Sequence, residues 1–273
     1  FVSTELKNKI RDAIQKNYLQ NNKTPPTLAC ILVGDNPASQ IYVNNKRKAC
    51  EYVGINSKII NLPENISFEE LFDAITKLNN DNRVSGILLQ LPLPLGLDEK
   101  TLVEHIAPEK DVDGLTTKNL GALFAGTQNI APCTATGILD LLEYYKIELD
   151  GKHAVVVGRS TLVGKSVAEL LEQQNATVTL CHSHTKDLKE ITKQADVLIV
   201  AVGKKHLITQ DMVKDGAVVV DAGINRVDGK IFGDVDFENV KEKASYITPV
   251  PGGVGPMTIA MLMTNLVKAT KLK

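Results

Sequence analysis

A tyrosine and a lysine stand one helical turn apart in the segment SQIYVNNK, which runs from Ser39 to Lys46. At about 100° per residue, one narrow sector of the predicted helix collects Ala38, Tyr42, Ala49 and Val53. Lys46 falls at the edge of this sector, beside Tyr42, whereas Arg47 falls on the opposite side. A lysine in that position either extends along the surface to solvent or is held half-buried for proton transfer. Helix geometry by itself favours the solvent-exposed alternative.

Two further motifs contain polar residues, one at the end of a predicted strand and one in a predicted turn. In QLPLP, Gln90 to Pro94, the glutamine would project at the carboxyl end of a buried strand, where α/β sheets bind ligands. It could equally satisfy the backbone of a loop. The motif DVDG, Asp111 to Gly114, resembles the start of a calcium loop but lacks the spaced ligands and the terminal glutamate. We therefore predict an Asx turn there and no metal site in the chain.

The turn GRSTLVG, Gly158 to Gly164, stands between a β-branched run and a helical pattern. A complete dinucleotide fingerprint would have glycine at the position of Ser160, so the sequence of the turn matches it only in part. The location of the turn between a strand and a helix supports dinucleotide binding more strongly. The next strand ends in CHSHT without a carboxylate, and Arg159 follows the first glycine. Arg159 and Ser183 would favour a 2′-phosphate, so we predict NADP in preference to NAD.

A glycine-rich and proline-rich segment, VPGGVGPMT, runs from Val250 to Thr258 and precedes the last predicted helix. Such a segment lets a planar ligand approach bare backbone, and Pro256 suits the first turn of a helix. A simple tight turn would need fewer glycines.

Composition limits the classes of function. The chain has 273 residues, 43% of them hydrophobic, and a formal charge of −1, so it can bury a large core and offers no basic footprint for nucleic acid or an anionic membrane. Its four cysteines form no CxxC pair, which is typical of a reducing compartment. We expect a cytoplasmic protein with a small-molecule partner, and the sequence leaves open an organellar leader removed before Phe1.

Strand-like runs at Thr27–Gly34, Ser57–Pro63 and Ser85–Pro92 alternate with helical patterns, which predicts a parallel α/β sheet. The helix that carries Lys46 should begin after Asn36 with Pro37 and end at Gly54. The segment SFEE, Ser67 to Glu70, is a capping-box pattern at the start of the next helix.

A second alternation begins at Gly151 and indicates a Rossmann-like domain. Its five β-rich runs are HAVVVG, ATVTLCHS, ADVLIVAVG, GAVVVDAGIN and SYITPV. We predict two α/β domains: an N-terminal substrate domain over residues 1–135, joined by a returning C-terminal helix over 256–273, and a nucleotide-binding domain over 136–255.

The motifs SxxYxxxK, QLPLP, DVDG, GRSxxVG, DAGIN and PVPGGVGPMT, in this order, resemble the bifunctional methylenetetrahydrofolate dehydrogenase/methenyltetrahydrofolate cyclohydrolase (FolD-type) family over nearly the whole chain. The resemblance implies a homodimer with a folate domain and an NADP domain. It also implies two reactions, oxidation of 5,10-methylenetetrahydrofolate with NADP to the methenyl compound and hydrolysis of the latter to 10-formyltetrahydrofolate.

The resemblance also implies roles for single residues. Lys46 would handle protons in the hydrolysis, Tyr42 would stack on the folate, Gln90 would tune Lys46, and Asp113 would anchor the pterin. The implied substrate-binding set is Tyr42, Val43, Lys46, Leu89, Gln90, Leu91, Asp113, Pro251, Gly252, Gly253, Val254, Gly255, Pro256, Met257, Thr258 and Ile259. The implied cofactor-binding set is Gly158, Arg159, Ser160, Gly164, Ser183, Gly203, Gly223 and Ile224.

The chain departs from the family pattern at two positions, and two alternative functions stay open. Members of this family commonly have proline where this chain has Ala135 and Ser166, which puts the rigidity of the cofactor loop in question. The alternatives are a monofunctional NAD(P)-dependent dehydrogenase and a catalytically silent folate- or nucleotide-binding protein. A short-chain dehydrogenase is rejected because its YxxxK pair would follow the glycine-rich turn, whereas Lys46 precedes it.

Overall fold

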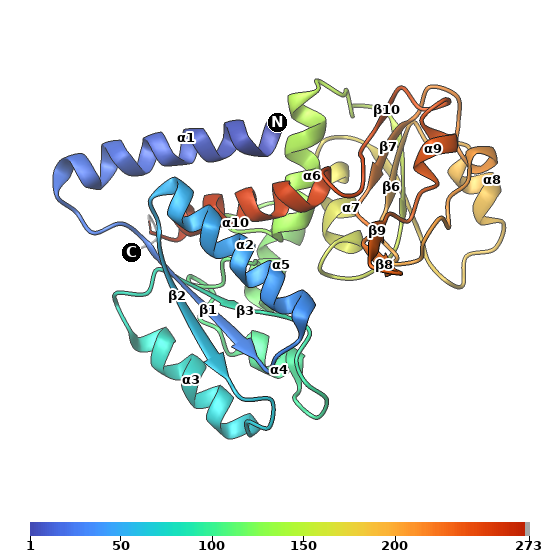
Figure 1. Ribbon diagram of the computed structural model, residues 1–273. Helices are drawn as coiled ribbons and strands as arrows, with labels where there is room; N and C mark the ends of the chain where they lie inside the picture. Colours follow the sequence, from blue (N-terminus) through green and yellow to red (C-terminus); the bar gives the residue numbers. More distant parts are fainter. Residues whose placement is uncertain (271–273) are drawn as a thin grey trace. The chain divides into compact units, whose positions relative to one another are not determined.

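The computed structural model describes residues 1–270, which form two compact units (Figure 1). One unit comprises Phe1–Cys133 and the C-terminal segment from Ile259, and the other comprises Thr134–Thr258. Both are built around a parallel sheet, as the alternating pattern predicted. Within the described residues, no helix is long and apolar enough to cross a membrane.

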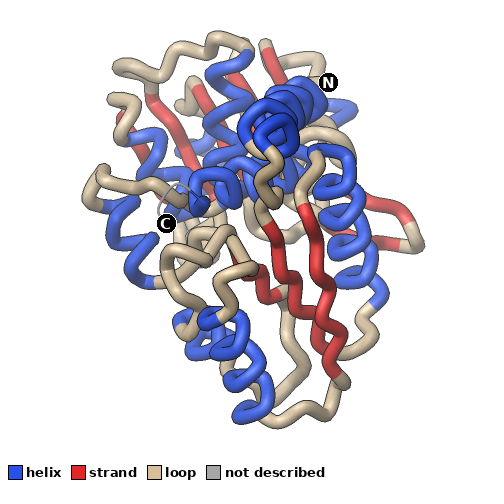
Figure 2. The backbone as a smooth tube through the Cα atoms, turned by 90° about the vertical axis from the view of Figure 1, so that its left-hand side faces the viewer, coloured by secondary structure: helices blue, strands red, loops and turns tan. Residues whose placement is uncertain are grey.

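The sheet of the first unit has the order β2-β1-β3, with all strands parallel and running side by side (Figure 2). The strands are β1 (Thr27–Val33), β2 (Asn56–Leu62) and β3 (Gly86–Leu89), and each lies within the segment predicted for it or one residue beyond. Its helices are α1 (Val2–Asn17), α2 (Pro37–Val53), α3 (Phe68–Asn80), α4 (Glu99–Glu104) and α5 (Thr117–Phe124), with a 3-10 turn η1 (Leu19–Asn21).

Alternation along β1 divides the core of this unit into two layers, because successive side chains of a strand point to opposite faces. One face packs against α1, α2 and the C-terminal helix α10 (Val254–Thr270) through Leu28, Cys30 and Leu32. The other face packs against α3 and α4 through Ala29, Ile31 and Val33. The C-terminal helix therefore returns to the first sheet, as predicted. Residues 271–273 of the predicted helix lie outside the described residues.

Local capping sets the ends of the two helices that carry the predicted signals. Asn36 Oδ1 accepts hydrogen bonds from the backbone N–H groups of Ala38 (2.9 Å) and Ser39 (3.2 Å), and Gly54 closes α2 with a left-handed φ of 79°. At the start of α3, Ser67 and Glu70 form the reciprocal capping box. These predictions are confirmed.

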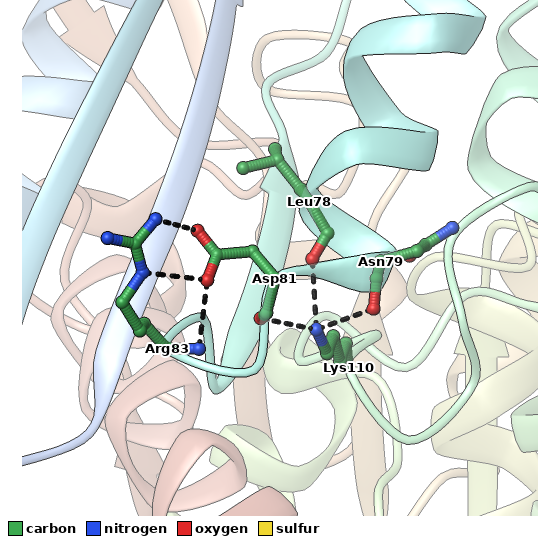
Figure 3. A network of polar contacts seen from close by, with 5 residues as sticks. All are labelled: Leu78, Asn79, Asp81, Arg83 and Lys110. Carbon is green, nitrogen blue, oxygen red and sulfur yellow. Dashed lines mark hydrogen bonds and ion pairs between the residues drawn. The ribbon is translucent and has the colours of Figure 1, made fainter.

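The C-terminal end of α3 is closed by a buried lysine from another segment (Figure 3). Lys110, 3% exposed, donates from Nζ to the carbonyls of Leu78 (2.9 Å), Asn79 (2.7 Å) and Asp81 (2.9 Å). A cation is stabilising there because the last carbonyls of a helix lack partners within the helix and carry partial negative charge.

The second unit contains a parallel five-stranded sheet with the order β10-β7-β6-β4-β5. Its strands are β4 (His153–Val157), β5 (Thr177–Cys181), β6 (Val197–Val200), β7 (Val218–Asp221) and β10 (Tyr246–Ile247). Its shorter elements are α7 (Gly164–Glu172), α8 (Leu188–Thr192), η2 (Gln210–Met212) and α9 (Phe237–Val240), and α6 (Cys133–Tyr144) contains the boundary between the units.

The structure differs from the predicted elements in the extent of two strands, in one additional hairpin and in the start of the last helix. The runs GAVVVDAGIN and SYITPV contribute only four and two strand residues, in β7 and β10. An antiparallel hairpin of β8 (Asn225–Val227) and β9 (Lys230–Phe232) was not anticipated, because its strands are too short to show a periodic pattern. Finally, α10 begins at Val254, two residues before the predicted Pro256.

Candidate functional site

A lysine–glutamine pair lies at the centre of the candidate site in the first unit. Lys46 Nζ, from α2, donates a 2.9 Å hydrogen bond to Gln90 Oε1. Gln90 follows β3 directly and is 8% exposed; its backbone N–H bonds the carbonyl of Ile31 (2.9 Å) and its Nε2 bonds the carbonyl of Leu91 (2.7 Å). The amide orientation is thereby fixed, with the oxygen directed to Lys46.

The predicted position of Lys46 at the edge of the apolar sector was wrong. The buried residues of α2 are Ser39, Val43, Ala49, Cys50 and Val53. At about 100° per residue, these positions lie on both sides of Lys46, so the lysine is at the middle of the buried face. The prediction omitted Val43 and Cys50, whose burial widens the apolar face on the far side of the lysine. Lys46 is half-buried, as is Tyr42 one turn before it.

Asp113 belongs to the same electrostatic cluster. Burial raises the pKa of its carboxyl group, the nearby Lys46 charge opposes that rise, and Asp111 adds to it. Asp111 accepts from the backbone N–H groups of Gly114 (3.0 Å) and Thr116 (2.8 Å), and its side chain thereby holds the loop around Asp113. These bonds reach three and five residues ahead, whereas an Asx turn bonds the residue two positions ahead, so the loop is closed in another way than predicted. The carboxyl group of Asp113 and the amino group of Lys46 are therefore close enough to interact electrostatically.

Buried thiols adjoin this cluster. Burial raises the pKa of Cys30 to about 11, against an opposing effect of Lys46. Burial and the neighbouring Asp113, which hydrogen-bonds to its thiol, also raise the pKa of Cys133 well above its ordinary value. Asn265 on α10 donates to Cys133 Sγ at 3.4 Å. Sequence reasoning missed these three residues, because nothing local distinguishes them from ordinary core positions.

The remaining predicted substrate residues have different surroundings. Val43 is buried on α2, whereas Leu89 (5% exposed) and half-buried Leu91 belong to the core layer on the α3 side of the sheet. In the segment Pro251–Ile259, only Pro251 to Gly253 form a turn, closed by a 2.9 Å hydrogen bond from Gly253 N–H to the carbonyl of Pro249. From Val254 the segment is helical, and it belongs to the second unit as far as Thr258.

The candidate cofactor turn of the second unit is compact. Gly158 has a φ of +124°, and a Cβ on Gly164 would lie 2.0 Å from the carbonyl oxygen of Gly158, so only glycine fits this close approach. Arg159 and Ser160 are exposed on the turn. Ser166, at a position where family members commonly have proline, donates to the carbonyl of Thr161 at 2.5 Å and so supplies a constraint of its own.

Arg159 lies close to the end of β5. Burial lowers the pKa of His182, and the positive charge of Arg159 lowers it further, as does His184. Ser183 is exposed beside them, and the segment from Cys181 to Thr185 contains no carboxylate. The site therefore offers positive charge and a hydroxyl group where an acidic residue would select a free ribose hydroxyl.

The other predicted cofactor residues follow β6 and β7, which are neighbours in the sheet. Gly203 comes three residues after β6, and Gly223 and Ile224 come two and three residues after β7, where Ile224 is 44% exposed. Because the strands are parallel, these residues share the carboxyl edge with the turn after β4. This set fits a dinucleotide. In the part of the chain that the structure describes, no group of three or more His, Cys, Asp or Glu side chains is placed to hold a metal ion.

Two family models match the chain in sequence. Residues 2–113 match the catalytic domain of tetrahydrofolate dehydrogenase/cyclohydrolase, and residues 132–273 match the NAD(P)-binding domain of the same family.

Individual relatives agree with these matches. The bifunctional protein FolD of Oceanobacillus iheyensis is 55% identical over 99% of this chain and 94% of its own length. A crystal structure of the bifunctional FolD enzyme from Campylobacter jejuni is 51% identical, with a TM-score of 0.96 over 99% of this chain and 96% of that one. The Trypanosoma brucei FolD, solved with NADP and an inhibitor, is 35% identical, with a TM-score of 0.95 over 99% and 95%.

Proposed function

The chain belongs to the tetrahydrofolate dehydrogenase/cyclohydrolase family, and on that premise we propose that it is a bifunctional folate enzyme. It oxidises 5,10-methylenetetrahydrofolate to 5,10-methenyltetrahydrofolate with NADP and hydrolyses the product to 10-formyltetrahydrofolate. Relatives that are bifunctional over nearly their full length support both activities. The single observation that supports the hydrolysis most directly is the 2.9 Å hydrogen bond between Lys46 and Gln90.

For the oxidation, we propose that the turn Gly158–Ser160 with Gly164, Ser183, Gly203, Gly223 and Ile224 holds NADP. When bound, the nicotinamide accepts the hydride that leaves the methylene carbon. Arg159 would pair with the 2′-phosphate, since a guanidinium binds phosphate oxygens through charge-assisted hydrogen bonds. The residues of the chain bind and orient both reactants, and proximity supplies much of the rate.

For the hydrolysis, we propose that Lys46 moves the proton. Water adds to a carbon that is already electrophilic in the methenyl cation, so this step needs a proton acceptor near the attacking oxygen and no metal. Gln90 holds the Nζ atom of Lys46 in place through the hydrogen bond of 2.9 Å. Lys46 then returns the proton to the ring nitrogen that leaves when the bridge opens, and the hydroxyl group derived from water releases its remaining proton to solvent as it becomes the formyl carbonyl.

For substrate binding, we propose that Tyr42 and Asp113 orient the folate. Tyr42 is half-buried one turn before Lys46, which places both side chains on one side of α2. The carboxyl group of Asp113 can accept hydrogen bonds from the amino group and ring nitrogen of a pterin. Burial raises the pKa of this carboxyl group, and the nearby charge of Lys46 opposes that rise.

Two further properties are proposed from the family resemblance and the cysteines. We expect a homodimer, which sedimentation equilibrium would detect as a particle of about twice the chain mass of 29.7 kDa. We also propose that the protein acts in a reducing compartment such as the cytoplasm, because its four cysteines are buried free thiols.

A spectrophotometric assay tests the function. Purified protein is mixed with 5,10-methylenetetrahydrofolate and either NADP or NAD, and a separate sample without cofactor receives the methenyl compound. We expect reduced cofactor with NADP and enzyme-dependent loss of the methenyl absorbance. Cofactor reduction without hydrolysis would instead identify a monofunctional dehydrogenase, and silence in both assays would identify a binding protein.

A further inference from the structure

Two buried aspartates in the second unit have no part in the chemistry described so far. Asp221 is the last residue of β7 and is 3% exposed, and Asp234, two residues after β9, is 0% exposed. No salt bridge to a lysine, arginine or histidine is formed by either of them within the described residues. A buried carboxylate without a cation must be stabilised by hydrogen bonds, and here backbone N–H groups supply nearly all of them.

Asp234 binds the loop that follows β6. Its Oδ2 accepts from the N–H groups of Val202 (2.7 Å) and Gly203 (3.0 Å), and its Oδ1 accepts from the N–H of Lys204 (2.8 Å). A fourth bond, at 2.9 Å, comes from Asn225 Nδ2. Three successive N–H groups thus converge on one carboxylate, in the arrangement that backbone otherwise offers to a bound anion.

Asp221 binds the backbone that carries Asp234. Its Oδ1 accepts from the N–H groups of Gly223 (2.9 Å) and Asp234 (3.0 Å), and its Oδ2 accepts from the N–H of Val235 (2.9 Å). The first of these bonds also holds the loop after β7, immediately before Ile224. The two carboxylates therefore connect the loops after β6 and β7 through the segment after the hairpin.

Two glycines make room for these carboxylates. A Cβ on Gly223 would lie 2.2 Å from Asp234 Cγ, and a Cβ on Gly233 would lie 1.9 Å from Asp221 Oδ2. Neither distance is possible for a real side chain. Gly223 was expected to contact the cofactor, and its close contact with Asp234 is a sufficient physical reason for glycine at that position.

We propose that Asp234, itself held by Asp221, is a positioning residue for the cofactor site, an inference that rests on the proposed NADP-dependent function. It fixes the loops after β6 and β7, which contain Gly203, Gly223 and Ile224. Because its carboxylate occupies the N–H groups of residues 202–204, these groups are closed to the phosphates of the cofactor. The phosphates must then be bound by the turn after β4, and Gly203 contributes a loop conformation.

The variant Asp234→Asn tests this role by replacing one acceptor oxygen with an amide that donates. At least one of the N–H groups then faces another donor, so the loops after β6 and β7 lose a bond that holds them in their cofactor-binding conformation. We expect the Kd for NADP, measured by calorimetry, to rise by at least about tenfold, while cofactor-free hydrolysis of the methenyl compound is retained. Asp228→Asn, at the exposed tip of the hairpin, is the matched control and should bind NADP normally.

The outcomes separate the inference from the function. If the wild-type protein binds NADP and Asp234→Asn binds it equally well, the positioning role is wrong and the function stands. If the wild-type protein does not bind NADP, the function and the inference both fail. Should Asp234→Asn not fold, hydrogen exchange on the wild-type protein decides: the exposed Gly203 and Lys204 amides should be protected, and exchange at the rate of free amides would overturn the inference.

Discussion

Gln90 presents a neutral oxygen to Lys46, and this matters for a side chain that changes its protonation state during the proposed hydrolysis. An amide carbonyl accepts a hydrogen bond from an ammonium group and from an amine alike. A carboxylate in the same place would strongly favour the ammonium form and so leave little neutral amine to accept a proton from water. The bond of 2.9 Å can therefore keep Nζ in place throughout the reaction.

Lys46→Met removes the proton acceptor and keeps most of the apolar stem. We expect hydrolysis of the methenyl compound to fall by at least about 100-fold, the lower range for a general acid–base group, while the Kd for NADP stays within about twofold. Lys48→Met, on the exposed side of the same helix, is the control and should leave both properties unchanged. Hydrolysis at a near-normal rate in Lys46→Met would exclude the proposed role.

Arg159→Ala tests how the turn after β4 recognises the cofactor. Removing a guanidinium from a phosphate costs roughly 1.5–3 kcal/mol, so we expect the Kd for NADP to rise about tenfold or more and the Kd for NAD to change little. Lys152→Ala, an exposed lysine at the opposite end of β4, controls for a general loss of positive charge. Equal losses for NADP and NAD would contradict recognition of the 2′-phosphate.

At the scale of elements, helix ends set the direction of the functional side chains. The cap at Asn36 and the left-handed Gly54 fix where α2 begins and ends, and hence which of its residues face the sheet. Lys46 lies in the middle of that face, so a shift of one residue in the helix would turn it by about 100° and remove it from Gln90. Capping therefore contributes to the geometry of the site as well as to stability.

Lys110→Met tests the closure of α3. The substitution leaves the carbonyls of Leu78, Asn79 and Asp81 without their common donor, and we expect the free energy of unfolding to fall by about 2–4 kcal/mol. Lys77→Met, on the exposed side of the last turn of α3, makes the same chemical change without breaking these bonds. Urea unfolding compares the two variants, and equal stabilities would show that the lysine does not close the helix.

At the scale of the whole molecule, α10 connects the end of the chain to the first unit. Asn265, 0% exposed, donates from Nδ2 to the carbonyls of Val112 (3.0 Å) and Ala131 (2.9 Å), far away in sequence. Val112 directly precedes Asp113, and Ala131 lies two residues before Cys133. The C-terminal helix thereby holds the loop that carries Asp113.

Asn265→Leu removes both donors within a similar volume. The two carbonyls lose their partner, while the Oδ1 atom, which has no hydrogen-bond partner among the described residues, is also removed, so we expect a net loss of about 1–3 kcal/mol. Thr264→Val, its neighbour on α10, is the control because its hydroxyl donates to the carbonyl of Ala260 within the same helix. Thermal unfolding that is equally unchanged in both variants would contradict this structural role.

Sequence by itself determined the local features. The three strands of the first sheet, the cap at Asn36 and the Ser67–Glu70 capping box were all predicted. These features depend on residues within a few positions of each other, so their physical causes are contained in short stretches of chain. The order of motifs also identified the family, because that order does not depend on packing.

Tertiary structure alone decided which residues surround the reactive groups. The place of Lys46 in the middle of a buried face, the thiols of Cys30 and Cys133, and the bonds of Asn265 arise from segments that are distant in sequence. The Asp221–Asp234 network and the β8–β9 hairpin were likewise not foreseen. Burial and long-range hydrogen bonds are properties of the packed chain, and local sequence patterns carry no information about which distant group will fill a given space.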